Sequence, residues 1–370
     1  MALRVGLLVL VLVLVLQALW PTAAAANQSL PVEVFMKGEN ISGFNPASDR
    51  RSYYCFRIPQ LLALPSKKLL AFAEGRADGC RPDGHVNRPI VVRASTDAGA
   101  TWGPIGIAGP ALPHAGTNYP GAYLRDKSTI ALRYSVSNGT VLETTSTDEG
   151  TTWSAPAVAS QPAGNVTCGS AWPKMLGSSV VIPCAAGHTA RSSDGGRSWT
   201  LSTTPIALDT NVTGVTGLGE AMAVPDGRSA TSLTMMIRAG SRNSRLNHAI
   251  AQSDDGGANW GPARLLPIVG STCEGSIGRD AAAPPGQVLL GATLGLNRFR
   301  LGRANMSVFS LDAANASAEP VPVQDVWPSA AGYSDMAQVP GGPVMVLFEG
   351  GGGVYDYGVK ISPVAGTPAE

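Results

Sequence analysis

The sequence predicts an all-β protein, a six-bladed β-propeller of four-stranded antiparallel sheets. Three observations lead to this expectation: a composition rich in turn-forming residues, a motif that recurs at a nearly regular interval, and short β-rich runs between its copies. Gly (44) and Pro (28) make up about a fifth of the 370 residues, 44% are hydrophobic and only 14% are charged. This is the composition of a globular chain in which many turns join short elements.

One eight-residue pattern occurs four times, with Ser first, Asp third, Gly fifth and Trp last. The copies are 95–102, 146–153, 192–199 and 253–260, so their starts are 51, 46 and 61 residues apart. Such spacing is typical of a repeated supersecondary unit. In each copy the Asp can bond to nearby backbone, the Gly permits a positive φ, and the Trp supplies an apolar face with one donor. We expect each copy to be a surface hairpin turn with a structural role.

Short β-rich runs lie between the copies, bounded by clusters of Gly, Pro, Asn and Asp. Examples are 90–93, 129–132, 179–182 and 233–237, and no amphipathic run of helical length is found. The 344 residues from 27 to 370 hold six units of roughly 50 to 60 residues, which matches four-stranded blades around an axis. Two blades then lack the motif, one of them the first or the last and the other near 289–312.

Residues 1–26 are typical of a cleaved secretory signal peptide. Arg4 precedes an apolar run over 5–16, and Ala residues at 23–26 suit a signal peptidase. The alternative is an uncleaved membrane anchor, but the run is short against the roughly 20 residues needed to span a bilayer. We therefore expect one domain over 27–370, with no stable membrane insertion after signal cleavage.

Glycosylation motifs and cysteines favour the secretory pathway, with a secreted or lysosomal destination. Asn-x-Ser/Thr occurs seven times, at Asn27, Asn40, Asn138, Asn165, Asn211, Asn305 and Asn315. Five cysteines in an oxidising compartment suggest two disulfides and one free thiol. Cys168 and Cys184 bracket a plausible hairpin, so the preferred pairs are Cys168–Cys184 and Cys55–Cys80.

Several function classes are disfavoured. Lys plus Arg (27) nearly equals Asp plus Glu (26), and loss of Arg4 with the leader makes them equal, so no nucleic-acid partner is expected. The four histidines are scattered and no Cys-x-x-Cys is present, so no metal site is expected. The sequence also lacks the Gly-x-Ser-x-Gly elbow of serine hydrolases.

The tetrapeptide Phe56-Arg57-Ile58-Pro59, upstream of several Ser-x-Asp-x-Gly-x-x-Trp boxes, resembles the sialidases (exo-α-neuraminidases) of the bacterial and animal type. The resemblance, which includes the Asp-box (BNR) repeats, runs over about 54–360. In that family three arginines bind the substrate carboxylate. The resemblance implies the following site residues, each from its local motif: Arg57, Arg238 and Arg303 as these arginines, Glu349 as the acid that steadies Arg57, Tyr333 as nucleophile and Glu220 as its base.

The segment from Ala71 to Arg76 also resembles the family, which implies that Arg76 faces the substrate near the loop of the general acid/base. The family places an Asp a few residues beyond this arginine. Here the sequence departs from the family pattern, because Asp78 and Asp83 both qualify. Asp83 is preferred because it leads into Gly-His and then the strand that ends at Arg93.

These residue types suit the chemistry that the resemblance implies. Sialic acid carries a carboxylate on its anomeric carbon, which guanidinium groups can bind through paired hydrogen bonds. A neutral phenol avoids the repulsion that a carboxylate nucleophile would meet there, and sialidases are a known exception to carboxylate nucleophiles. The expected function is therefore an exo-α-sialidase that hydrolyses terminal sialic acids of sialylated glycans with retention and without a cofactor. The alternatives are a non-catalytic carbohydrate-binding propeller, a trans-sialidase, and a hydrolase of deaminated sialic acid.

Overall fold

The computed structural model describes residues 30–39, 55–76, 80, 88–110, 116–164, 166, 168–169, 172–208, 215–241, 246–271, 273–295, 302–353 and 356–367. The strands all lie in one compact unit, Pro31–Glu370. The predicted signal peptide at 1–26 lies outside the described residues. Within the residues that are described, no helix is long and apolar enough to cross a bilayer.

Sixteen consecutive strands form four antiparallel sheets of four strands each, in chain order. The first contains β2 (Cys55–Ala63), β3 (Leu69–Arg76), β4 (Ile90–Ser95) and β5 (Gly106–Gly109), and the second β6 (Thr117–Leu124), β7 (Ile130–Val136), β8 (Val141–Ser146) and β9 (Ala157–Val158). The third contains β10 (Lys174–Leu176), β11 (Ser179–Pro183), β12 (Thr189–Ser192) and β13 (Thr200–Leu201), with a 3-10 turn η1 (Ala185–Gly187) before β12. The fourth contains β14 (Val215–Pro225), β15 (Leu233–Ser241), β16 (His248–Ser253) and β17 (Arg264–Leu265).

The other seven strands form one antiparallel sheet in the order β1-β23-β22-β21-β20-β19-β18. They are β1 (Val32–Phe35), β18 (Ser276–Gly278), β19 (Gln287–Thr293), β20 (Ala304–Asp312), β21 (Val321–Gln338), β22 (Val344–Gly351) and β23 (Tyr357–Pro363). The long strand β21 changes partner at Ala330, which pairs with Ala304 on β20 and with Gly351 on β22. Because β1 pairs with β23, the first described strand completes the last sheet.

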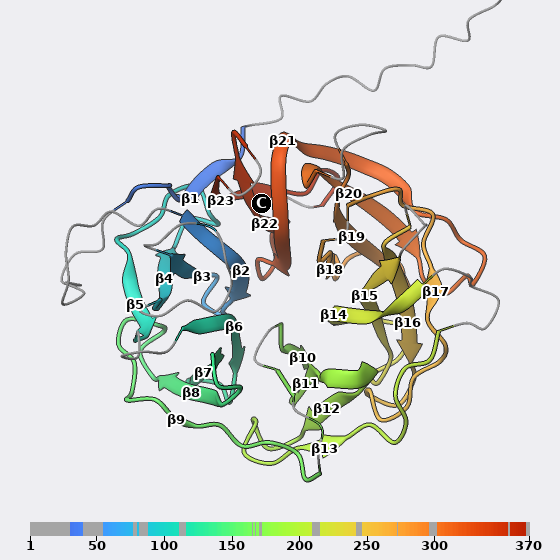
Figure 1. The fold of residues 1–370 in the computed structure, drawn as a ribbon, viewed down its shortest axis with the longest axis horizontal. Helices are drawn as coiled ribbons and strands as arrows, with labels where there is room; N and C mark the ends of the chain where they lie inside the picture. The colour runs from blue at the N-terminus through green and yellow to red at the C-terminus, as the bar shows by residue number, and fades with distance from the viewer. Residues whose placement is uncertain are drawn as a thin grey trace, which may run out of the picture. The chain divides into compact units, whose positions relative to one another are not determined.

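The sheets are arranged around a central axis, with β2, β6, β10, β14, β18 and one end of β21 nearest to it (Figure 1). The prediction of an all-β propeller of four-stranded antiparallel sheets is confirmed. The prediction of six separate sheets is not matched, because the strands make four four-stranded sheets and one of seven. The predicted runs at 90–93, 129–132, 179–182 and 233–237 overlap β4, β7, β11 and β15.

The four repeats join the third and fourth strands of the four-stranded sheets. In the first copy, Gly99 N donates to Ser95 Oγ at 2.9 Å and Thr101 N donates to Asp97 Oδ1 at 2.9 Å. The same two bonds recur in the other copies. Their fifth-position glycines have φ between 83° and 91°, which an L side chain rarely adopts. The repeats are turns that stabilise the sheets.

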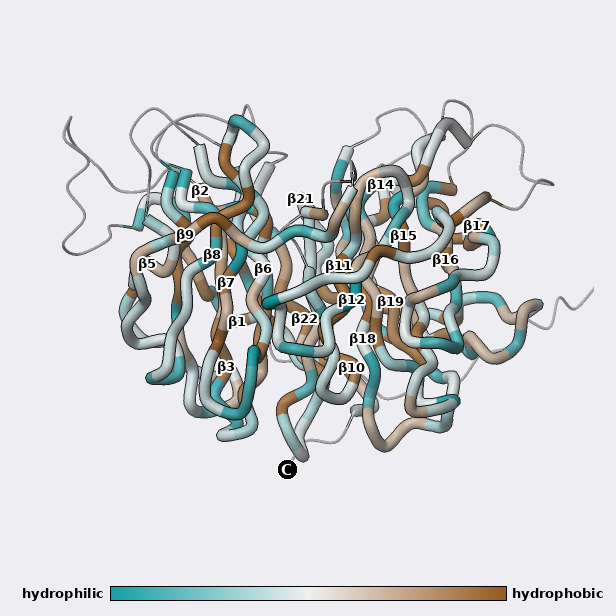
Figure 2. The backbone as a smooth tube through the Cα atoms, turned by 90° about the horizontal axis from the view of Figure 1, so that it is seen from below, coloured by the Kyte–Doolittle hydropathy of each residue, from teal (hydrophilic) through white to brown (hydrophobic). Residues whose placement is uncertain are grey.

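Apolar side chains fill the spaces between neighbouring sheets, and Figure 2 shows hydrophobic stretches along the strands. One cluster includes Ile58, Met236, Cys273, Ile277 and Tyr333, which come from four different strands and one loop. Both preferred disulfides, Cys55–Cys80 and Cys168–Cys184, are present, and Cys273 is free. The Cys55–Cys80 bridge ties the start of β2 to the chain just beyond β3.

Candidate active site

Tyr333 on β21 and Glu220 on β14 lie in direct contact. The Tyr333 hydroxyl donates a hydrogen bond to Glu220 Oε1 at 2.6 Å. Tyr333 is only 5% exposed, whereas Glu220 is partly exposed. A hydroxyl held this close to a carboxylate has the geometry of a nucleophile with its general base.

The surroundings of Tyr333 keep its phenol neutral. Burial raises the pKa of Tyr333, and the Glu220 carboxylate raises it further. Removal of the proton in the resting protein would place two negative charges side by side in a poorly hydrated position. The resting phenol therefore keeps its proton, which it shares with Glu220 in a hydrogen bond.

Local irregularities in the strands place these side chains. Five of the shifts in pairing register lie at or beside residues of the candidate site: Arg57/Gln60 on β2, Asn118/Gly121 on β6, Leu218/Ala221 on β14, Ala304/Met306 on β20 and Ala331/Ser334 on β21. A β-bulge bends a strand and re-aims its side chains. The non-glycine residues with positive φ include Ile58, Tyr119 and Asn305, which lie at three of these bulges. Three of these shifts contain Arg57, Glu220 and Tyr333, and a fourth begins one residue after Arg303.

Glu349 on β22 bonds to the backbone of β21 at Tyr333 as well as to an arginine. Its Oε2 accepts the Tyr333 amide at 3.2 Å, and its Oε1 accepts the Ile58 amide at 2.8 Å. A Cβ atom at position 332 would overlap Glu349 Oε2, so Gly332 is required for this approach. The carboxylate thereby connects β2, β21 and β22.

Arg57 pairs with Glu349 through two hydrogen bonds, as the sequence predicts. Arg57 Nε donates to Oε1 at 3.0 Å and Arg57 Nη2 donates to Oε2 at 3.3 Å. The two side chains are 3% and 0% exposed. Burial alone would lower the pKa of Arg57, but the charge and hydrogen bonds of Glu349 outweigh it and raise that pKa. The guanidinium is therefore a fixed cation.

Arg238 on β15 lies against the Tyr333–Glu220 pair. Its Nη1 donates to Glu220 Oε2 at 2.5 Å and to the Tyr333 hydroxyl at 3.2 Å. Its side chain is 28% exposed, so the same guanidinium also meets solvent. Arg238 can therefore orient Glu220 and still contact a ligand.

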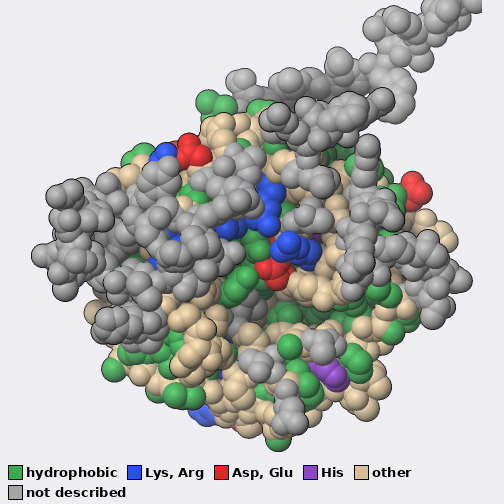
Figure 3. Space-filling model, viewed as in Figure 1, with side chains coloured by type: hydrophobic (Ala, Val, Ile, Leu, Met, Phe, Trp, Pro, Cys, Tyr) green, Lys and Arg blue, Asp and Glu red, His purple; other side chains and the backbone are tan. Residues whose placement is uncertain are grey.

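Arg303 completes a set of three arginines around Tyr333. Its Cζ lies 5.3 Å from the centre of the Tyr333 ring, and Arg57 Cζ lies 5.2 Å from it. Arg303 is partly exposed, and its carbonyl accepts the Ala331 amide of β21 at 3.1 Å. Figure 3 shows Lys or Arg side chains beside acidic ones near the middle of the face seen in Figure 1. The structure thus brings together six of the sequence-predicted site residues: Arg57, Glu220, Arg238, Arg303, Tyr333 and Glu349.

Arg76 occupies a more enclosed position at the end of β3. It is 1% exposed, and its Nε and Nη2 donate to Glu74 Oε2 at 2.8 and 2.5 Å. Its Nη1 donates to the carbonyl of Cys80 at 2.7 Å, next to the first disulfide. The two candidates for the general acid/base, Asp83 and Asp78, lie outside the described residues.

Three further residues of the site were not found from the sequence. Trp172 stacks on Tyr333 with a centroid distance of 6.0 Å, and the Tyr119 hydroxyl donates to Glu220 Oε1 at 3.3 Å. Neither residue lies in a recognisable sequence motif. Both contact residues that are far away in the sequence and belong to other sheets of the propeller. Glu74 accepts hydrogen bonds from Arg76 and from the Tyr119 amide, the latter at 2.9 Å. Glu74 lies two residues before Arg76 on the same strand. Since residues two apart on a strand share one face, this spacing could have predicted that the two side chains meet.

Cys273 and His248 are buried next to the arginines and are not arranged as metal ligands. Burial raises the pKa of the Cys273 thiol to about 12. Burial also lowers the pKa of His248 to about 4. Over the described ranges, no group of three or more His, Cys, Asp and Glu side chains is placed to hold a metal ion.

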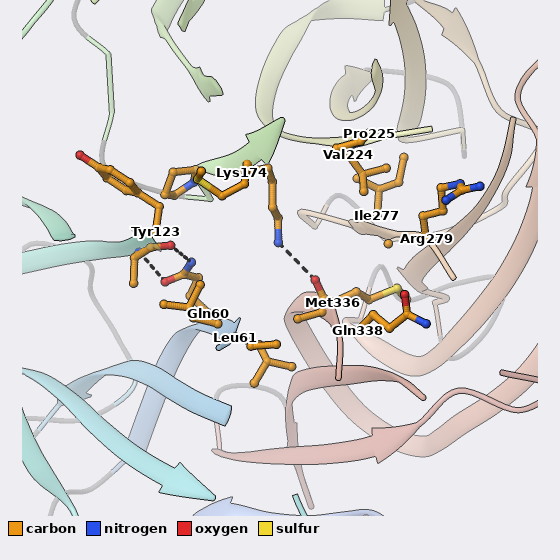
Figure 4. A pocket seen from close by; sticks show the side chains of 17 residues that line it. Gln60, Leu61, Tyr123, Lys174, Val224, Pro225, Ile277, Arg279, Met336 and Gln338 are labelled. Carbon is orange, nitrogen blue, oxygen red and sulfur yellow. Dashed lines mark hydrogen bonds between the residues drawn. The ribbon is translucent and has the colours of Figure 1, made fainter. Parts of the chain in front are cut away.

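Two cavities differ in their relation to this site. One of about 360 Å³ is lined by Gly217, Leu218, Gly219, Glu220, Arg238 and Gly240, so it lies beside two residues of the candidate site. The other, of about 340 Å³, is lined by later residues of β2, β14 and β21 (Figure 4). There Lys174 bonds to Asp335 at 2.6 Å and Gln60 bonds to Ala122, so these polar groups already have partners. Of these two, the first cavity is the one lined by residues of the candidate site.

Comparison with known proteins relates the chain to sialidases by fold. No protein-family model and no curated protein matches the sequence. Among solved structures, a mutant of the NanB sialidase from Streptococcus pneumoniae has a TM-score of 0.69 at 14% identity, covering 91% of this chain and 71% of the other. The intramolecular trans-sialidase from Ruminococcus gnavus, in complex with oseltamivir carboxylate, has a TM-score of 0.64 at 17% identity, covering 90% and 98%. The Trypanosoma rangeli sialidase in complex with sialic acid has a TM-score of 0.64 at 16% identity, covering 93% and 60%. The chain therefore has the fold of these sialidases and trans-sialidases.

Proposed function

We propose that the protein is an exo-α-sialidase that removes terminal α-linked sialic acids from glycans with retention of configuration. The observation that carries the proposal is the 2.6 Å hydrogen bond between the Tyr333 hydroxyl and Glu220, surrounded by Arg57, Arg238 and Arg303. A non-catalytic sugar-binding propeller has no need of a nucleophile in contact with a base. The fold similarity to sialidases is consistent with this function.

The arginines supply binding energy at the carboxylate. Of the three, Arg57 is held by Glu349 and Arg238 by Glu220, so their positions are fixed before a ligand arrives. Charge-assisted hydrogen bonds contribute about 1.5 to 3 kcal/mol each, and preorganised donors lose little entropy on binding. A carboxylate attached directly to the anomeric carbon would bring that carbon close to Tyr333.

The reaction then proceeds by two displacements. The Tyr333 oxygen forms a bond to the anomeric carbon as the glycosidic bond breaks, and Glu220 accepts the phenol proton. Asp83, the preferred general acid, donates a proton to the leaving oxygen and then takes one from the attacking water. Water attacks the anomeric carbon from the face opposite Tyr333, the Tyr333–carbon bond breaks, and Glu220 returns the proton to the phenol. Two inversions give net retention.

Two features of the chain also belong to this proposal. Since β21 pairs with β20 before Ala330 and with β22 after it, we infer that the seven-stranded sheet counts as two blades, which gives six in total.

The sequence features of 1–26, the glycosylation motifs and the disulfides support a secreted or lysosomal location.

The experiment is hydrolysis of a fluorogenic α-sialoside by the purified protein, with Tyr333→Phe as the matched control. We expect fluorophore release by the wild type only, and nuclear magnetic resonance should detect the α-anomer of sialic acid as the first product. A 2,7-anhydro product would assign the protein to the intramolecular trans-sialidases, one of which has been solved with 2,7-anhydro-Neu5Ac. Binding of sialic acid without any cleavage would favour a sugar-binding propeller.

A further inference from the structure

A fourth carboxyl group, Glu274, lies beneath the nucleophile and has no part in the reaction proposed above. It is 1% exposed and lies between Cys273 and the strand β18. Its Oε2 accepts the backbone amide of Ser334 at 3.3 Å, and its Oε1 has no hydrogen-bond partner among the described residues. A buried carboxyl group with one contact to the residue after Tyr333 requires an explanation.

The neighbours of Glu274 are mainly negative. Three carboxylates face it, and each has its own cation: Glu220 with Arg238, Glu349 with Arg57, and Asp335 with Lys174. Glu274 itself forms no ion pair within the described part of the chain. Beside its loop, the Cys273 thiol and His248 are buried and neutral at pH 7, and the cations Arg238 and Arg303 lie on the side of Cys273. A charge on Glu274 would be desolvated, unpaired and repelled by three like charges.

The backbone of Tyr333 is held from both sides. The amide of Tyr333 bonds to Glu349 and the next amide, of Ser334, bonds to Glu274. Regular pairing between β21 and β22 is interrupted from Ala331 to Ser334, so side-chain carboxyl groups replace ladder bonds there. A second contact, between the hydroxyls of Ser276 and Ser334 at 2.7 Å, joins the same two segments.

We propose that Glu274 is a positioning residue for Tyr333: as an uncharged carboxyl group it holds the Ser334 amide and so fixes the direction of the phenol towards Glu220. This role rests on the proposed sialidase function for its effect on turnover, but the uncharged state of Glu274 does not depend on it. Burial and the Glu220 charge raise the pKa of Glu274 well above its ordinary value, which agrees with the geometry.

The uncharged state is tested by stability rather than activity. Glu274→Gln keeps the shape and the acceptor oxygen but cannot ionise. An acid whose pKa is raised by folding costs the wild type stability as pH rises above the unfolded value of about 4.3. The Tm of Glu274→Gln minus that of the wild type should therefore increase from pH 5 to pH 8, by roughly 2 °C or more. For the exposed control Glu319→Gln, the Tm difference from the wild type should be the same at pH 5 and at pH 8. A constant difference for Glu274→Gln would overturn the uncharged state.

The positioning role is tested by turnover of a fluorogenic sialoside. Glu274→Gln should keep kcat close to wild type, whereas Glu274→Ala should lower kcat by about tenfold or more with little change in KM, since the arginines still bind the carboxylate. If Glu274→Ala does not fold, Glu274→Asp, which is one methylene shorter, replaces it with the same expectation. Wild-type kcat in the shortened variant would overturn the role. A wild type without sialidase activity would instead overturn the proposed function, and the stability measurement would still decide the state of Glu274.

Discussion

The amide of Ile58 donates a 2.8 Å hydrogen bond to Glu349 Oε1, which joins two residues 291 positions apart. Ile58 has φ of 54°, a conformation that a β-branched residue seldom adopts without support. The same carboxylate oxygen accepts Arg57 Nε at 3.0 Å. One side chain thus supports both an unusual backbone position and the arginine next to it.

Loss of Glu349 should therefore destabilise the fold as well as the site. We expect Glu349→Ala to lower the free energy of unfolding by about 3–5 kcal/mol, because it leaves the buried Arg57 cation without its partner. Urea unfolding measures this change. Glu349→Gln keeps an acceptor oxygen and should lose less, and the exposed Glu319→Ala should lose almost nothing. A Glu349→Ala variant as stable as the wild type would contradict the supporting role.

Arg303 should matter for turnover but little for stability. It is partly exposed, and its backbone carbonyl bonds to the Ala331 amide of β21, a bond that Arg303→Ala keeps. We expect Arg303→Ala to lower kcat/KM by about tenfold to a hundredfold, the value of one lost charge-assisted bond to carboxylate, with nearly unchanged Tm. Arg197→Ala, at an exposed turn position of the third repeat, is the matched control. Unaltered kcat/KM in Arg303→Ala would remove this residue from the site.

Asn305 should carry no glycan although it lies in a glycosylation motif. It is partly buried, has φ of 54°, and lies two residues from Arg303. Asn138 and Asn315 are exposed at turns and are better placed for modification. Mass spectrometry of protein from a glycosylating host should find Asn305 unoccupied. Occupancy there would contradict the placement of a ligand beside Arg303.

Acid should weaken the fold through His248. Burial lowers its pKa from 6.5 to about 4. Since the folded value is lower than the unfolded one, this residue contributes full stability above about pH 6.5 and loses it as pH falls towards 4. We expect roughly 2 kcal/mol less stability at pH 5 than at pH 7 from this residue. His248→Gln should reduce the difference in urea midpoints between these two pH values, and an unchanged difference would exclude His248 as the cause.

Local patterns predicted the repeated turns and the strands β4, β7, β11 and β15, but not the continuity of β21. That strand contains Pro322 and Pro328, which normally argue against a long paired strand. Its pairing is possible because it changes partner near Pro328, from β20 to β22. How the last strands divide into sheets therefore depends on pairing between strands, which a short stretch of sequence does not reveal.

The site was predictable where a motif carried it and not elsewhere. Arg57 and Tyr333 lie in recognisable segments, and the structure brings both to Glu349. Tyr119 and Glu274 have no motif: their roles arise from a bulge in β6 and from burial beneath β21. These roles depend on contacts between segments that are distant in the sequence. The periodicity of hydrophobic residues and the spacing of motifs therefore do not predict them.

The covalent step itself gives the sharpest test of the proposed function. A 2,3-difluoro sialic acid should label the protein, because the fluorine next to the anomeric carbon slows the second displacement more than the good leaving group slows the first. The label should map to a peptide containing Tyr333. Tyr333→Phe should not be labelled, yet a transition-state-like sialic acid analogue should still raise its Tm, since Arg57, Arg238 and Arg303 remain. A label on Glu220 or Asp83 would reverse the assigned roles, because the carboxylate and not the phenol would then be the nucleophile. Absence of both label and cleavage, with the analogue still bound, would mean that the 2.6 Å contact between Tyr333 and Glu220 serves binding alone.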